Sequence, residues 1–219
     1  NSSSNYWCHL APDPLFCKPL FDKNSVQNFL RLTGLPSSFI LLPSSASIGS
    51  YKNPELVAKA LTNPLLKDLH LVITSPSSAK LADTIRSAYP SIKSRVHSAC
   101  FNSTELKLAY QTAVAVVIPS RAEGFGLPCV EAMASGGITL VSDVIGLREA
   151  GSEASLRFKD NSPDSLSAYL ALLTNPSTGP YFRSILCRRA PLRLHKLHPH
   201  LFALCLLTTS RLSLAKRLV

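Results

Sequence analysis

The stretch Pro119–Gly137, PSRAEGFGLPCVEAMASGG, decides the fold of this chain. It follows the apolar run Ala113–Ile118 and contains a glycine-rich bend, so it predicts a buried strand, a tight loop and then a helix. In an open α/β sheet this order presents a ligand at the carboxyl ends of the strands. Glycines let the backbone approach the ligand closely, and the amide groups and positive end of a helix attract phosphate.

Two glutamates flank this bend. Glu123 precedes it and Glu131 follows inside the predicted helix, with seven residues between them. Carboxylates accept hydrogen bonds from sugar hydroxyls, whereas the bend itself suits phosphate. The combination indicates a sugar nucleotide. The alternative is an ordinary strand-to-helix turn with one capping and one surface glutamate.

The residues on both sides of this stretch continue the alternation of strand and helix. Apolar runs predict strands over residues 38–43, 69–75, 95–99, 113–119, 138–142 and 155–158. Helices are predicted over residues 25–32, from Pro54 onward, and over 78–88, 104–112 and 164–173, with residues 146–151 as a short turn. Strands that are apolar throughout and separated by helices form a parallel sheet covered on both faces. The fold class is therefore α/β, a doubly wound, Rossmann-like parallel sheet.

The composition divides the chain into three segments. Residues 1–37 are predicted to be a crossover or linker, 38–178 a nucleotide-sugar-binding domain, and 179–219 a basic, Leu/Arg-rich tail. Eight of the 23 Lys and Arg residues follow Pro180 with no acidic residue among them, so the net charge of +10 belongs mostly to the tail. A nucleic-acid-binding domain would carry its basic residues on the folded body, so nucleic acid is not an expected partner.

Three interpretations of the tail stay open: a divergent pair of terminal helices, a basic amphipathic segment lying on a membrane surface, and a sequence that is not the native ending. The six cysteines are scattered without a CxxC pair, which favours free thiols over disulfides or zinc. We accordingly expect a cytoplasmic protein, with the inner membrane face as a candidate location for peripheral contact.

The letters EGFGLPCVEAMASG resemble the donor-binding motif of the retaining GT-B glycosyltransferases of family 4, or group 1. The resemblance extends over roughly residues 38–175 and is dense over 119–150. It implies the carboxyl-terminal, donor-binding half of a GT-B fold, and 219 residues are too few for both halves. The implied enzyme transfers a hexose from a nucleoside diphosphate sugar to a glycan or lipid-linked acceptor with retention. Without its amino-terminal domain this piece is expected to bind donor and turn over little.

The same resemblance implies roles for the residues of the motif. Glu131 would accept hydrogen bonds from the donor ribose, and Glu123 would lie beside the transferred sugar as a catalytic residue. The backbone of Gly124, Phe125, Gly126 and Leu127 would cradle the diphosphate and the sugar, with the Phe125 ring packing under the loop. No protein carboxylate need form a covalent adduct, because the leaving diphosphate assists proton removal.

A cationic pair that binds the departing diphosphate is only half present. The family places an Arg about five residues before a Lys after its first strand, and Lys52 matches the Lys as the second catalytic candidate. Residues 45–47, Ser-Ala-Ser, stand where the Arg would fall. Arg121 is a candidate substitute for it. Glu149 matches a Glu that the family carries after the next strand, or it is a helix-capping acid.

No cofactor or divalent metal is expected, since no DxD pair of carboxylates occurs and cations plus helix amides can carry the phosphates. The missing Arg keeps a second hypothesis open, a sugar-nucleotide-binding module without transfer activity. A third is a GT-B sugar-nucleotide epimerase, ranked last because those enzymes generally lack the EGFGLP segment.

Overall fold

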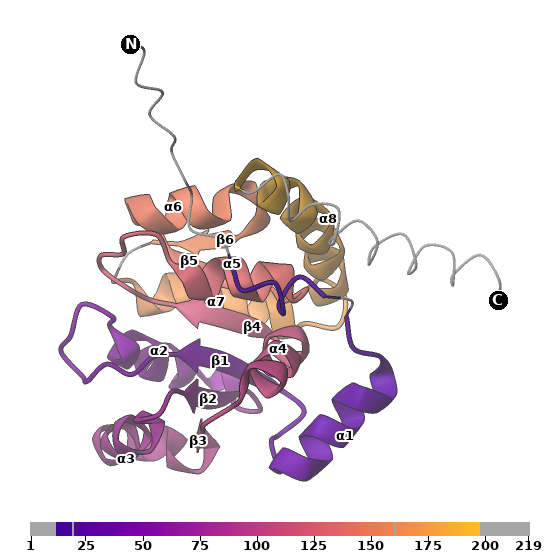
Figure 1. Cartoon of the computed structure of the whole chain (residues 1–219). Coiled ribbons are helices and arrows are strands. Elements are labelled where there is room, and N and C mark those ends of the chain that lie inside the picture. The colour runs from indigo at the N-terminus through magenta and orange to yellow at the C-terminus, as the bar shows by residue number, and fades with distance from the viewer. Residues whose placement is uncertain (1–11, 19, 160, 198–219) are drawn as a thin grey trace.

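A computed structural model describes residues 12–18, 20–159 and 161–197 of the chain. Within these ranges the strands form one six-stranded parallel sheet in the order β3-β2-β1-β4-β5-β6 (Figure 1). The strands are β1 (Phe39–Pro43), β2 (His70–Thr74), β3 (Val96–Ala99), β4 (Ala115–Ile118), β5 (Thr139–Ser142) and β6 (Leu156–Phe158). The predicted doubly wound, Rossmann-like sheet is confirmed.

Helices connect the strands and cover both faces of the sheet (Figure 1). They are α1 (Lys23–Thr33), α2 (Pro54–Leu61), α3 (Ser78–Ala88), α4 (Ser103–Thr112), α5 (Leu127–Ala134), α6 (Ile145–Gly151), α7 (Pro163–Thr174) and α8 (Gly179–Leu197), with short 3₁₀ helices η1 (Pro64–Leu66), η2 (Pro90–Arg95) and η3 (Ser152–Ala154). Helix α2 begins at Pro54 as predicted, because proline lacks the N–H that the first helical turn leaves unpaired.

One local prediction is wrong. Residues 146–151 are not a short turn but most of α6, which begins at Ile145. The two glycines at its ends, Gly146 and Gly151, lower helix propensity and therefore suggested a turn. Both are buried in the structure, and packing against the neighbouring loop outweighs their propensity.

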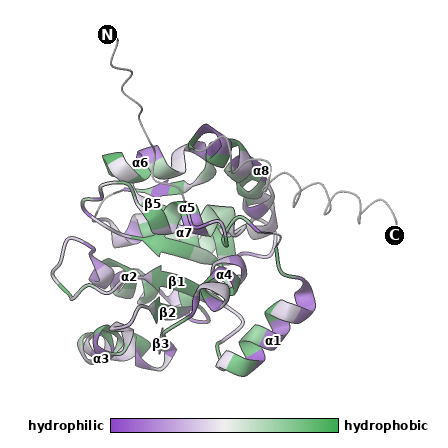
Figure 2. Cartoon of the chain, in the orientation of Figure 1, coloured by the Kyte–Doolittle hydropathy of each residue, from purple (hydrophilic) through white to green (hydrophobic). Residues whose placement is uncertain are grey.

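Alternating residues of the central strands β1, β4 and β5 enter two separate hydrophobic cores. Phe39 and Leu41 of β1 join a core with residues of α1, α4, α5 and α6, whereas Ile40 and Leu42 join a second core with α2, α3 and α7. The central strand β1 is coloured as hydrophobic in Figure 2, as burial of both faces requires. The sheet therefore holds the carboxyl ends of β1 and β4 rigidly side by side.

The segments at both ends of the described chain pack on this sheet. Lys107 of α4 is buried, and its ammonium donates to the carbonyls of Leu15 (3.2 Å) and Lys18 (2.6 Å), which fastens the turn at residues 14–18 to α4. Helix α8 contributes Leu194 and Leu197 to the first core. Residues 1–11 and 198–219, the remainder of the predicted linker and basic tail, lie outside the described residues.

No helix in the described part of the chain is long and apolar enough to cross a membrane. Four cysteines lie in that part, Cys17, Cys100, Cys129 and Cys187, and no disulfide joins any two of them. Cys8 and Cys205 lie outside it.

Candidate functional site

The candidate site lies where the sheet reverses its direction of winding. From β1 the chain crosses to β2 on one side, and from β4 it crosses to β5 on the other, while β1 and β4 are neighbours. The crevice at the carboxyl ends of such a strand pair is where open α/β sheets bind ligands. The loops after β1 and β4 carry Lys52 and Glu123, so the sheet topology brings these two predicted residues together.

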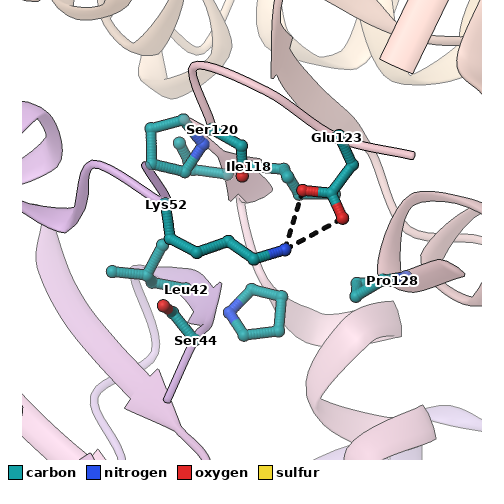
Figure 3. A pocket seen from close by; sticks show the side chains of 10 residues that line it. Leu42, Ser44, Lys52, Ile118, Ser120, Glu123 and Pro128 are labelled. Carbon is teal, nitrogen blue, oxygen red and sulfur yellow. Dashed lines mark hydrogen bonds and ion pairs between the residues drawn. The ribbon is translucent and has the colours of Figure 1, made fainter. Parts of the chain in front are cut away.

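A small cavity opens at this crevice between the ends of the two strands (Figure 3). It encloses about 20 Å³, which is room for about one water molecule. The residues that line it come from β1, β4 and their following loops, with one from α5: Leu42, Pro43, Ser44, Lys52, Val117, Ile118, Pro119, Ser120, Glu123 and Pro128.

Lys52 and Glu123 point toward each other across this cavity and form an ion pair (Figure 3). The ammonium donates to both carboxylate oxygens, at 2.9 Å to Oε1 and 2.7 Å to Oε2. The Glu123 side chain is 13% exposed and that of Lys52 is 32% exposed, so water screens the pair only in part. The cavity at the carboxyl ends of β1 and β4 is therefore lined by both a cation and an anion.

The hydroxyl of Ser120 adds an unsatisfied polar group to the same cavity. Ser120 is 1% exposed, and its Oγ finds no hydrogen-bond partner among the described residues. A buried hydroxyl without a partner costs free energy, and such groups mark places where a ligand or water completes the bonding. The motif did not point to Ser120, although a serine directly after a predicted buried strand was a usable signal.

Arg121 does not line the cavity. Its Nε donates to Asn161 Oδ1 (2.9 Å), and its Nη2 donates to Asn53 Oδ1 (3.2 Å). The Arg121 backbone N–H also donates to the carbonyl of Tyr51 (2.7 Å). Arg121 thus ties the loop after β4 to the loop that carries Lys52 and to the loop after β6. Nothing in the sequence indicated Asn161, because its role depends on a contact between distant loops.

Two glycines shape the bend, one by its backbone conformation and one by its close contact with the main chain. Gly126 is buried in the left-handed region (φ +88°), where glycine alone carries no penalty, and it precedes the first turn of α5. Gly146 of α6 lies against the bend from the other side, since a Cβ there would stand 2.2 Å from the carbonyl oxygen of Glu123. Phe125 is half-buried and packs against the first core, as predicted. The backbone of residues 123–126 is therefore held between α5 and α6.

Glu131 lies on α5 outside the cavity of Lys52 and Glu123. Tyr110 of α4 donates its hydroxyl proton to Glu131 Oε2 at 3.1 Å. Burial raises the pKa of the Glu131 carboxyl, the Tyr110 hydrogen bond lowers it, and the charge of Asp13 raises it. The two motif glutamates are thus in different surroundings, one ion-paired and one bonded to a phenol.

Glu149 is an exposed residue of α6 and does not line the cavity. Arg193 of α8 donates to the backbone carbonyls of Glu149 and Ala150. Within the described ranges no group of three or more His, Cys, Asp and Glu side chains is placed to hold a metal ion.

Residues 27–179 match the family model of the glycosyl transferases group 1. The chain belongs to this family. The six-stranded parallel sheet and its flanking helices agree with the Rossmann-like fold of GT-B glycosyltransferases of known structure.

A short part of this group 1 chain is similar to a characterised relative. Over 49 residues it is 51% identical to the O-antigen chain mannosyltransferase RfbU of Salmonella typhimurium, which is 22% of this chain and 13% of RfbU.

Solved structures share the fold at low sequence identity. The structure of Anabaena HepE in complex with UDP and glucose has a TM-score of 0.67 and 15% identity, covering 93% of this chain and 55% of HepE. The carboxyl-terminal domain of the group 1 protein LpcC of Francisella tularensis has a TM-score of 0.58 and 17% identity, covering 85% of this chain and 97% of that domain. The chain therefore spans about half the length of HepE.

Proposed function

We propose that this group 1 chain is the donor-binding, carboxyl-terminal half of a retaining hexosyltransferase that uses a nucleoside diphosphate sugar. The observation that carries the proposal is the Lys52–Glu123 pair at the switch point, beside the unpartnered hydroxyl of Ser120. A cation, a carboxylate and a free hydroxyl donor meet the needs of a diphosphate joined to a sugar. The UDP and glucose held by HepE and the mannosyltransferase activity of RfbU support a nucleotide-linked hexose.

In this proposal each motif residue has one task. The Lys52 ammonium neutralises the diphosphate, and Glu123 accepts hydrogen bonds from the sugar hydroxyls. Glu131 accepts hydrogen bonds from the ribose, and the backbone of Gly124–Leu127 surrounds the diphosphate. Arg121 acts by fixing the loop that carries Lys52, and Glu149 remains a candidate at the edge of the site.

The transfer step itself needs no covalent enzyme intermediate. The acceptor oxygen forms a bond to the anomeric carbon on the face that the diphosphate leaves, and the bond from that carbon to the phosphate oxygen breaks. The departing diphosphate takes the acceptor proton. We assign no metal or cofactor to this step, because the ammonium of Lys52 and backbone amides stabilise the charge that develops on the diphosphate.

Calorimetry with UDP and GDP tests the donor-site assignment. The wild-type chain should bind at least one of the two, and Glu131→Ala should weaken that binding by roughly 10- to 100-fold, the value of about 1.5–3 kcal/mol for hydrogen bonds to a charged group. Glu153→Ala, at an exposed position in η3, is the matched control and should bind like wild type. Equal heats from wild type and Glu131→Ala would refute the assignment of Glu131.

A second candidate function is a sugar-nucleotide-binding module that does not transfer. The observation that favours it is the Ser-Ala-Ser sequence at residues 45–47, where the family carries a phosphate-binding Arg. Joining the chain to its amino-terminal domain and assaying sugar transfer separates the two. If the full protein binds UDP or GDP but transfers sugar to none of many offered acceptors, the result supports the binding module.

We also propose that the protein works in the cytoplasm at an acidic membrane face. The exposed side of α8 supports this: among its described residues it carries Arg188, Arg189, Lys196, Tyr181 and Leu192 and no acidic side chain. Sedimentation with vesicles tests it, since binding should require anionic lipid and fall with salt. Equal sedimentation with neutral vesicles would contradict it.

A further inference from the structure

Tyr110 is a buried tyrosine whose hydroxyl reaches Glu131, the second glutamate of the motif. It lies in the last turn of α4 and is 1% exposed. Its hydroxyl donates to Oε2 of Glu131 at 3.1 Å, which joins α4 to the helix that follows the glycine-rich bend. Among the described residues no hydrogen-bond donor reaches the other oxygen of Glu131, Oε1.

The position of this tyrosine is fixed from two sides. Its ring packs against the ring of Phe16, with the centroids 5.8 Å apart at an angle of 58°. Its backbone carbonyl lies so close to Gly137 that a Cβ there would stand 2.5 Å away. Because Gly137 lies just after the end of α5, this contact sets the distance between α4 and α5. Packing therefore fixes the Tyr110 side chain in the orientation that points its hydroxyl at Glu131.

Burial and the neighbouring carboxylate keep the proton on the tyrosine. Burial, together with the charge of Glu131, raises the pKa of Tyr110 well above its usual value, so the phenol donates at any physiological pH. Two other titratable groups bear on the pair from the packed elements. Cys129 comes from α5, and Asp13 comes from the turn before α1.

We propose that Tyr110 is a positioning residue for the donor: its hydroxyl holds Oε2 of Glu131 so that Oε1 faces the ribose hydroxyls. The proposal rests on the function proposed above, in which Glu131 receives the ribose. A carboxylate that is held by one oxygen keeps its orientation without filling both of its acceptor sites. It also loses less rotational freedom when the nucleotide binds.

Tyr110→Phe tests this inference, because it removes one oxygen atom and keeps the ring against Phe16. In calorimetry with UDP and GDP at neutral pH, the variant should bind about tenfold more weakly than wild type. Tyr169→Phe on α7, a half-buried tyrosine outside the site, is the matched control and should leave affinity unchanged.

The pH profile separates positioning from a general loss of structure. The hydrogen bond lowers the pKa of Glu131, so its removal should move the acid limb of UDP or GDP affinity to higher pH. On the Glu131→Ala background, Tyr110→Phe should add no further loss. A Tyr110→Phe variant that keeps wild-type affinity and the wild-type acid limb of that affinity would overturn this inference and leave the proposed function standing. Failure of the wild-type chain to bind UDP or GDP would overturn the proposed function, and this inference with it.

Discussion

At the scale of single residues, Lys52 and Glu123 each hold the other in the place where a donor would bind. The ammonium contacts both carboxylate oxygens, so it is already neutralised before any phosphate arrives. In the proposed function the diphosphate must replace the carboxylate at the ammonium, which releases Glu123 toward the sugar. UDP carries no transferred sugar, so when it binds, Glu123 loses its contact with Lys52 and gains no sugar hydroxyl in exchange.

This exchange predicts opposite effects of two substitutions on UDP binding. Glu123→Gln should tighten UDP binding several-fold, since it frees the ammonium without changing the shape of the side chain. Lys52→Met should weaken it by roughly tenfold or more, since hydrogen bonds between charged groups contribute about 1.5–3 kcal/mol. Calorimetry at one fixed ionic strength measures both.

The exposed Lys59 of α2 supplies the control for charge. Lys59→Met removes the same net charge as Lys52→Met and should leave UDP affinity unchanged. Weaker UDP binding by Glu123→Gln would show that Glu123 does not compete with the diphosphate for Lys52.

A second prediction at this scale concerns the backbone contact of Gly146. In a helix, Gly→Ala usually stabilises by up to about 1 kcal/mol, but here the new Cβ would meet the Glu123 carbonyl oxygen at 2.2 Å. The clash should prevail, and Gly146→Ala should destabilise the chain by about 1–3 kcal/mol in urea unfolding. Gly124→Ala is the control, because no atom lies within 4 Å of the position that its methyl group would take, and its stability should change by less than about 0.5 kcal/mol.

At the scale of elements, the strands and most helices could be predicted because their signals are local. The continuous apolar runs locate the strands, and Pro54 marks the first residue of α2. Helix α6 could not be predicted, because its two glycines are tolerated only where the neighbouring loop packs on them. The same holds for the site: the motif selected Glu123 and Glu131, whereas the contacts of Asn161 and Tyr110 join segments far apart in the chain.

A histidine pair near the edge of the sheet predicts that the folded state loses stability in acid. His70 Nδ1 and His97 Nε2 lie 2.9 Å apart between β2 and β3, and burial lowers the pKa of both rings below the ordinary 6.5. The unfolded chain therefore binds protons more readily than the folded one. Stability should be constant above about pH 7.5 and should fall as the pH drops through 6.5 toward the lower pKa of the folded state.

Urea unfolding between pH 5 and pH 8 checks this sign. His97→Gln should flatten the decline, because Gln does not titrate in this range. A decline of the same size in His97→Gln and wild type would contradict the assignment to this pair.

At the scale of the whole molecule, α8 packs as an integral part of the described body. It contacts α5, α7 and η3, and its Leu186 enters the second core while Leu194 enters the first. The basic side chains of residues 179–197 thus lie on a helix whose other side is buried. We therefore propose that the donor-binding domain continues to residue 197, beyond the sequence-based boundary at 178.

Two leucines of α8 test this boundary. Leu194 is 3% exposed, so Leu194→Ala should destabilise the chain by about 2–5 kcal/mol, the usual cost of a cavity in a core. Leu192 is 60% exposed, and Leu192→Ala should cost less than about 0.5 kcal/mol. Urea midpoints that coincide for the two variants would place α8 outside the cooperative unit.

The guanidinium of Arg121 has a mechanical consequence for the loops around the cavity. It bonds Asn53 on the connection after β1 and Asn161 on the connection after β6, while its own residue follows β4. Three strand ends are thereby joined into one body, so the main chain beneath Lys52 cannot swing away from that beneath Glu123. Exchange of the Lys52–Glu123 contact for a ligand contact then requires rotation of these two side chains rather than movement of the loops that carry them.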